Sequence, residues 1–226
     1  MTKVIIFDAS TLISLSMNGL LEELKKLKDT FKGDFVIPKE VKKEVIDRPI
    51  KIKRFELEAM KIQNLIDEGY LVMPKKFGIE DQKITKLMIK YISLANSMFI
   101  GNGRKIELIH DGEAACLALS KILDEKGIDN VLAIDERTTR MLVEKPENLQ
   151  KLMEKRTHVR IKLKESNFKS FEGFKIIRST ELMYVAYKKG LLRWKNKNVL
   201  DGILFALKFK GCAISYEDIE KIKKIV

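Results

Sequence analysis

The sequence predicts an α/β fold with a central, mostly parallel sheet flanked by helices and with a helical insertion. Short apolar runs without alternation, at 4–9 and 131–135, are typical of strands buried on both faces of a parallel sheet. Between such runs, apolar residues recur at helical spacing, and strands that alternate with helices favour βαβ units. At 226 residues, the chain can bury a sizeable core as one domain, with or without a large insertion.

The first half of the chain alternates strand and helix patterns. Strands are predicted at three short apolar runs, 4–9, 34–37 and 70–73. Helices are predicted from apolar residues at helical spacing, over 11–27, over a segment after Pro38, over 52–67 and over 83–98. Pro38 suits the first turn of a helix, where its missing N–H costs nothing. The glycine-rich segment 101–105 is predicted to be a flexible basic loop.

The second half continues the alternation around one basic segment. Strands are predicted at 131–135 and 175–178. Helices are predicted over 113–126, over 136–143, over 181–189, from Asn196 or Asn198 to 209, and after Ser215. Gly127, Gly190 and Gly211 follow three of these helices, where glycine commonly ends a helix. Residues 146–169 are rich in Lys and Arg and lack turn residues, so we interpret them as an insertion, helical at 149–155 and extended at 157–163.

The charge balance favours a polyanionic partner. The formal net charge is +12 and the isoelectric point is near 9.5, which suits nucleic acid or another anionic surface. Abundant lysine with only three glutamines is also typical of thermophile proteins, so part of the excess has that alternative explanation. A small substrate needs no broad positive field, which argues against a phosphatase-like hydrolase of small molecules.

The chain carries no feature of a secreted or membrane protein. No apolar run approaches the ~20 residues that span a bilayer. Met1-Thr2-Lys3 leads directly into a strand, so we expect no signal peptide, no membrane contact and a cytoplasmic location. Cys116 and Cys212 lack the spacing of a zinc site, and we expect both to be buried free thiols.

Four acidic residues stand at the ends of predicted elements. Asp8 and Asp135 close buried strands. Glu44 lies on the helix after Pro38, and Glu113 opens an Ala- and Leu-rich helix. Open α/β sheets bind ligands at the carboxyl ends of their strands. Carboxylates gathered there would repel one another unless a cation held them, and Mg²⁺ or Mn²⁺ suits such ligands. The pattern predicts all four acids as metal ligands and catalytic residues.

Several of the acids also have a purely structural alternative. Asp8 could cap the first helix, with Ser10 steadying either its carboxylate or a metal-bound water. Asp111 is interpreted as the N-cap of the helix at 113 or as an auxiliary acid. Asp135 could cap the helix that follows it, with metal binding through water as a second task. Glu136 is then a first-turn acid and an auxiliary candidate.

Basic side chains near the predicted cleft or in the basic segments are candidates for phosphate contacts. These candidates are Arg104, Lys105, Arg137, Arg140, Arg156 and Arg160. A solvated helix face is the alternative reading for Arg137 and Arg140.

Four stretches that contain the acids resemble the PIN-domain family of nucleases. They read FDASTLISL, IPKEVKKEV, GEAACLALS and AIDERTTR, in the order that the family has. The C-terminal runs STELMYVAYKKGL and NVLDGILFALKFKGCAIS also look like archaeal and bacterial members. The resemblance covers most of the chain as a single domain over 1–226, and leaves about 50–107 and 146–173 as extended insertions.

The resemblance implies a three-layer fold and a pocket of three or four acids that binds Mg²⁺ or Mn²⁺ and cleaves single-stranded RNA. By position, Asp8, Glu44, Glu113 and Asp135 match the family's acids, and Ser10 matches its small hydroxyl residue. The third acid is often Asp in the family, and Glu113 departs from that.

Three function classes remain open from the sequence. The first is a single-strand-specific ribonuclease, free-standing or as the toxin of a toxin–antitoxin pair. The second is an RNA-binding scaffold with little or no turnover, in RNA processing or at the ribosome. The third, a small-substrate hydrolase, is disfavoured by the charge. A homodimer is a further open alternative, since PIN-like domains often pair.

Overall fold

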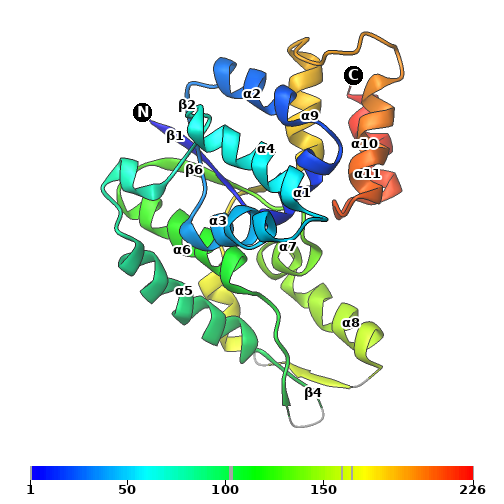
Figure 1. Ribbon diagram of the computed structural model, residues 1–226. Helices are drawn as coiled ribbons and strands as arrows, with labels where there is room; N and C mark the ends of the chain where they lie inside the picture. Colours follow the sequence, from blue (N-terminus) through cyan, green and yellow to red (C-terminus); the bar gives the residue numbers. More distant parts are fainter. Residues whose placement is uncertain (1, 102–103, 159, 164, 226) are drawn as a thin grey trace.

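A central parallel sheet organises the molecule. The computed structural model describes residues 2–101, 104–158, 160–163 and 165–225. Within these residues, the sheet has five strands in the order β3-β2-β1-β6-β8, and every pair in it is parallel (Figure 1). The strands are β1 (Lys3–Phe7), β2 (Gly33–Val36), β3 (Leu71–Val72), β6 (Asp129–Ala133) and β8 (Ile176–Ile177). The predicted α/β fold with a parallel sheet is therefore confirmed.

The strand β1 lies at the centre of the sheet. Ile5 faces Phe35 of β2 on one side and Val131 of β6 on the other. Four of its five residues are buried, which accounts for the continuous apolar run. Because β1 and β6 are neighbours and parallel, the residues that follow them emerge side by side at one edge of the sheet. Those residues are the ones that carry Asp8 and Asp135.

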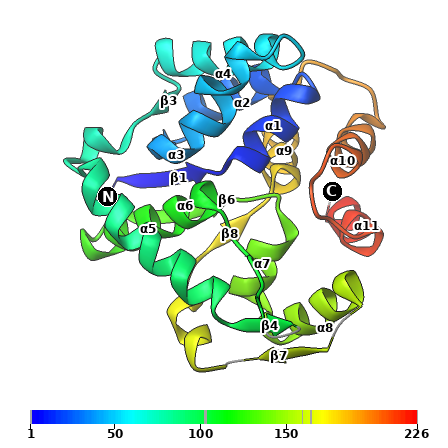
Figure 2. The ribbon, with the colours of Figure 1, turned by 60° about the horizontal axis from the view of Figure 1, so that its bottom comes forward.

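Helices cover both faces of the sheet and give three layers. Figure 2 shows α1 (Ala9–Met17), α2 (Leu21–Thr30) and α4 (Glu56–Asp67) on one side of β1, with α5 (Asp81–Asn96) and α6 (Asp111–Glu125) on the other. The apolar residues of α6 pack directly on β1 and β6. The other helices are α3 (Lys39–Lys42), α7 (Arg137–Glu144), α8 (Pro146–Thr157), α9 (Ser179–Lys188), α10 (Val199–Phe209) and α11 (Tyr216–Lys224).

Two helix predictions differ from the structure. The single helix expected over 11–27 is two helices, because the chain turns at Gly19, whose φ of +66° favours glycine. The helix after Pro38 begins as α3 and continues as a π-helical segment, Lys43–Asp47. A π-helical turn is a local widening that is frequent at functional sites. Short 3₁₀ segments occur at Pro49–Lys51, Pro74–Phe77 and Glu165–Phe171.

The two segments expected to be insertions meet in a second, smaller sheet. Its order is β5-β4-β7, with β4 (Phe99–Gly101), β5 (Arg104–Lys105) and β7 (Ile161–Leu163) paired antiparallel. The two ends of the segment predicted as a loop over 101–105 are therefore strand residues, and Gly101 pairs with Arg104. The first of these segments also provides β3, at the edge of the central sheet. Along the part of the chain that the structure describes, no helix is both long and apolar enough to cross a membrane.

Candidate active site

Asp8 directly follows β1 and serves as the N-cap of α1. Its Oδ2 accepts hydrogen bonds from the Ser10 backbone N at 3.0 Å and from Ser10 Oγ at 2.5 Å. Its Oδ1 is buried and has no hydrogen-bond partner among the described residues. Burial raises the pKa of Asp8 to about 7, and the charge of Glu113 acts in the same direction, against the hydrogen bonds from Ser10. A buried carboxylate with one unpartnered oxygen is costly unless something else binds it.

Glu44 lies in the π-helical segment and reaches the start of α6. Its Oε1 accepts a hydrogen bond from the backbone N of Gly112 at 3.2 Å. Burial raises the pKa of Glu44, and the charge of Asp8 raises it further. A Cβ on Gly112 would lie 2.8 Å from Glu44 Oε2. Glycine at position 112 therefore leaves room for the carboxylate in this position, and a side chain there would displace it.

Glu113 occupies the first turn of α6, where its carboxylate reaches back to the start of the helix. Its Oε2 accepts a hydrogen bond from the backbone N of His110 at 3.0 Å. Burial raises the pKa of Glu113, and the charges of Glu44 and Glu136 add to the effect. The N-cap is His110, so the expected capping role of Asp111 is wrong; Asp111 is the first residue of α6 and is exposed.

The charges of Asp8, Glu44 and Glu113 thus act on one another, and each raises a neighbour's pKa. The buried thiol of Cys116 donates a hydrogen bond to the Phe7 carbonyl at 3.6 Å. Burial, together with the charges of these acids, raises the pKa of this thiol well above its ordinary value. Cys116 and Cys212 are both buried and free, as predicted.

Among the described residues, hydrogen bonds from neighbouring groups orient one oxygen of each of these three acids. Ser10 holds Asp8 Oδ2, the amide of Gly112 holds Glu44 Oε1, and the amide of His110 holds Glu113 Oε2. In the described part of the chain, however, no three His, Cys, Asp or Glu side chains converge closely enough to hold a metal ion. The acids therefore lie within electrostatic range of one another, and ligation by all three at once needs side-chain movement.

Asp135 is placed differently from the other three. It is fully buried, and both of its carboxylate oxygens bind Ser179, with Oδ1 at 2.7 Å from the backbone N and Oδ2 at 2.6 Å from Oγ. Asp135 thereby accepts a hydrogen bond from a backbone N–H at the start of α9 that has no partner within the helix. Its backbone N donates to Ser10 Oγ at 3.1 Å, so a hydrogen bond joins it to the residue that holds Asp8.

The expected capping of α7 by Asp135 is wrong. Glu136 is the N-cap of α7, where its Oε2 accepts from the backbone N of Thr139 at 2.7 Å. Its charge also acts on Glu113, which brings this auxiliary candidate to the edge of the acidic group.

The candidate basic residues fall into two places. Arg137 and Arg140 lie on α7 and line one pocket beside Asp135. Lys105, Arg156 and Arg160 are exposed around the small sheet and α8, which Figure 2 shows at one end of the molecule, away from α1 and α3. The side chain of Arg104 lies outside the described residues.

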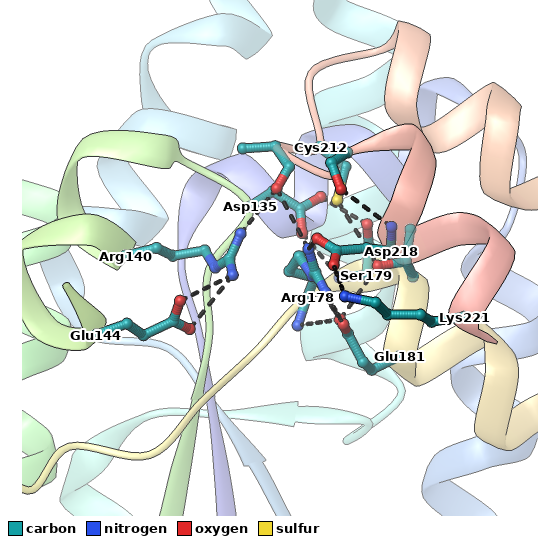
Figure 3. Close-up of polar contacts among 12 residues, drawn as sticks. Asp135, Arg140, Glu144, Arg178, Ser179, Glu181, Cys212, Asp218 and Lys221 are labelled. Carbon is teal, nitrogen blue, oxygen red and sulfur yellow. Dashed lines mark hydrogen bonds and ion pairs between the residues drawn. The ribbon is translucent and has the colours of Figure 1, made fainter. Parts of the chain in front are cut away.

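A network around Arg178 was not found from the sequence. Its guanidinium binds Glu181, with Nε 2.7 Å from Oε1, and contacts Asp218, with Nη1 3.3 Å from Oδ2 (Figure 3). Burial raises the pKa of Glu181, but the hydrogen bonds and charge of Arg178 outweigh it and the pKa is lowered overall. Asp218 lies 40 residues beyond Arg178 in the chain. Only the capping box that joins Arg178 to Glu181, three residues later, is a local signal in the sequence.

Comparison of the chain with protein-family models, with characterised proteins and with solved structures finds no match. The resemblance to PIN-domain nucleases accordingly stays a prediction from the motifs.

Proposed function

We propose that this protein is a metal-dependent ribonuclease that hydrolyses phosphodiester bonds of single-stranded RNA and uses Mg²⁺ or Mn²⁺. The observation that carries the proposal is the state of Asp8. This carboxylate is buried at the end of the central strand, and one of its oxygens lacks a partner among the described residues. Burial, together with the charge of Glu113, raises its pKa. Such crowded carboxylates are typical of functional sites, and a divalent cation would relieve their repulsion.

The donor set fits a hard divalent ion. Asp8 would bind it through Oδ1, which has no hydrogen-bond partner among the described residues, and Glu44 and Glu113 would bind it through their neighbouring carboxylates. Asp135 has both oxygens engaged by Ser179, so it would support the site by fixing Ser10. A bound ion would lower the pKa of water and stabilise charge that develops on the phosphate.

The chain's own residues would prepare the site. Ser10 orients Asp8 through two hydrogen bonds. The amide of Gly112 orients Glu44, and the absence of a side chain at position 112 keeps that carboxylate close to α6. The net charge of +12 supports RNA as the substrate, because exposed Lys and Arg would contact phosphates. Without these basic residues, the carboxylates of Asp8, Glu44 and Glu113 would repel the RNA.

A labelled single-stranded RNA, incubated with Mn²⁺, with Mg²⁺ or with EDTA, tests the proposal. The wild type should cut it only with metal, and Asp8→Asn should abolish cutting while the fold stays intact. Asp81→Asn is the matched control, since it removes one exposed carboxylate from the first turn of α5 and should cut like the wild type. Cutting that persists in EDTA or in Asp8→Asn would refute the assignment.

A second candidate function is an RNA-binding scaffold with little or no turnover. It is favoured by one observation, the lack of three converging metal ligands in the described part of the chain. The same assay separates the two: RNA binding that weakens with salt, without cutting under any metal, would support the scaffold. Antitoxin binding and dimer formation stay predictions from the resemblance.

A further inference from the structure

We propose that a pocket beside Asp135 binds a phosphate group of the nucleic acid at a second point, apart from the acids. The identity of that ligand rests on the proposed function. The pocket has a volume of about 420 Å³ and lies between α7, the start of α8, the residue before α9, the end of α10 and the start of α11. The cations that line it are Arg137, Arg140, Lys145, Arg178 and Lys208, and the acids are Glu144 and Asp218.

Two arginines meet at one wall of the pocket. Arg140 Nη1 lies 2.8 Å from the carbonyl oxygen of Ala213, and Arg178 Nη1 lies 3.5 Å from the same oxygen. Both side chains are mostly buried, at 14% and 12% exposed. Figure 3 shows both arginines with their acidic partners, Arg140 with Glu144 and Arg178 with Glu181 and Asp218. Because these acids and the Ala213 carbonyl already engage both guanidinium groups, the two arginines form a fixed wall, and a phosphate would draw mainly on the other cations of the pocket.

The other cations differ in how firmly they are held. Lys208 binds the carbonyl of Ile214 and lies 4.4 Å from the ring centre of Tyr216. Arg137 is exposed, and neither it nor Lys145 has an ion-pair partner within the described residues. Five cations line the pocket against two acids, and one of the cations, Arg178, is also paired with Glu181, so the balance is still net positive and an anion would complement it.

Hydrogen bonds join the pocket to the acidic site. The backbone N of Ala213 donates to the Asp135 carbonyl at 3.0 Å, while its own carbonyl receives the two arginines. The backbone N of Asp135 donates to Ser10 Oγ, and Ser10 holds Asp8. One strand could therefore place one phosphate at the acids and another in the pocket. The pocket would then orient the strand as well as bind it.

The phosphate could be an internal one of the strand or a terminal one. The recognition chemistry is the same, so the experiment uses two RNA oligonucleotides of about 12 nucleotides, alike except for a 5′-phosphate or a 5′-hydroxyl. Binding is followed by fluorescence anisotropy in EDTA, which prevents cutting, at several salt concentrations. The test variant is Arg137→Gln with Lys145→Gln. The control is Lys32→Gln with Lys86→Gln, two exposed lysines outside the pocket.

The test variant should lose about 1.4 from the slope of log affinity against log salt, at ~0.7 for each phosphate contact with a single strand. Between about 50 and about 200 mM salt, its affinity should then fall about sevenfold less than that of the wild type. The control should keep the wild-type slope. Equal affinity of wild type for the two RNAs assigns an internal phosphate, and a preference for the 5′-phosphate that the variant loses assigns a terminal one. Equal slopes in the test and control variants would overturn the proposal.

A second arm needs no RNA and separates this proposal from the proposed function. Inorganic pyrophosphate should raise the thermal midpoint of the wild type and of the control, and should raise it less in the test variant. If pyrophosphate acts in this way but the wild type binds no RNA, the phosphate pocket holds and RNA as its ligand is overturned. If pyrophosphate stabilises all three proteins equally, the pocket itself is refuted.

Discussion

Asp8→Asn should make the metal-free protein more stable at alkaline pH and change its pH dependence in a defined direction. The pKa of Asp8 is about 7 in the folded protein, against an ordinary value of 3.8. Between these values the folded state holds a proton that the unfolded chain has lost, so stability falls as pH rises. The difference corresponds to about 4 kcal/mol as an upper bound.

Asparagine is a suitable replacement because it keeps the local structure and removes the charge. Its side-chain oxygen can still accept from the Ser10 backbone N and cap α1. The variant therefore lacks the cost of ionising a buried group next to Glu113, and it also lacks the charge that raises the pKa of Glu44, which favours the variant at alkaline pH in the same direction. Its advantage over the wild type should be small below about pH 4, grow through the interval up to about pH 7, and stay level above it.

Urea unfolding followed by circular dichroism, in EDTA and at intervals from acid to alkaline pH, measures this difference. The comparison of the two proteins removes the contributions of other groups, such as Glu181 and Asp218, whose pKa values are lowered and whose effect has the opposite sign. A stability difference that does not change with pH would refute the inference that Asp8 is buried with a raised pKa. An advantage that shrinks as pH rises would also refute it.

Two further substitutions test the supports of the site. Gly112→Ala should leave stability nearly unchanged in urea unfolding, because about 1 kcal/mol gained in helix propensity offsets about 1 kcal/mol from the lost hydrogen bond to Glu44. RNA cleavage should fall about a hundredfold, because the carboxylate of Glu44 is displaced. Unchanged cleavage would contradict the role of the glycine. Ser179→Ala should cost about 1–3 kcal/mol, because it leaves one buried oxygen of Asp135 without its hydroxyl donor. Ser215→Ala, which removes the exposed cap of α11, should cost about 1 kcal/mol in the same unfolding assay, and a smaller loss for Ser179→Ala than for Ser215→Ala would contradict the reasoning for Ser179.

The parts of the fold that depend on local pattern could be predicted from the sequence. The apolar runs of β1 and β6 have no alternation because both faces of the central strands are covered. A run of consecutive apolar residues can be recognised in the sequence directly. The break at Gly19 was missed because leucines continue at helical spacing on both sides of it. Periodicity reports burial and does not reveal a turn between two helices that share the same core.

The candidate site likewise has a part that local sequence pattern predicts and a part that depends on contacts between distant residues. The ends of strands carry Asp8 and Asp135, and this much follows from the sequence. Ser179 lies 44 residues beyond Asp135 in the chain, so its binding of both carboxylate oxygens needs the folded structure. Glu44 and Gly112, whose amide binds its carboxylate, are 68 residues apart in the chain, so local sequence pattern does not predict this contact either.

The small sheet makes the two long segments of the chain interdependent for protein engineering. β4 takes its partners from both segments, with β5 on one side and β7 on the other. Trimming only the second segment would expose the backbone groups of β4 along the edge that β7 now covers, and an uncovered edge invites pairing with another molecule. A minimal version of this domain should therefore remove β4, β5 and β7 together, and should retain β3, which belongs to the central sheet.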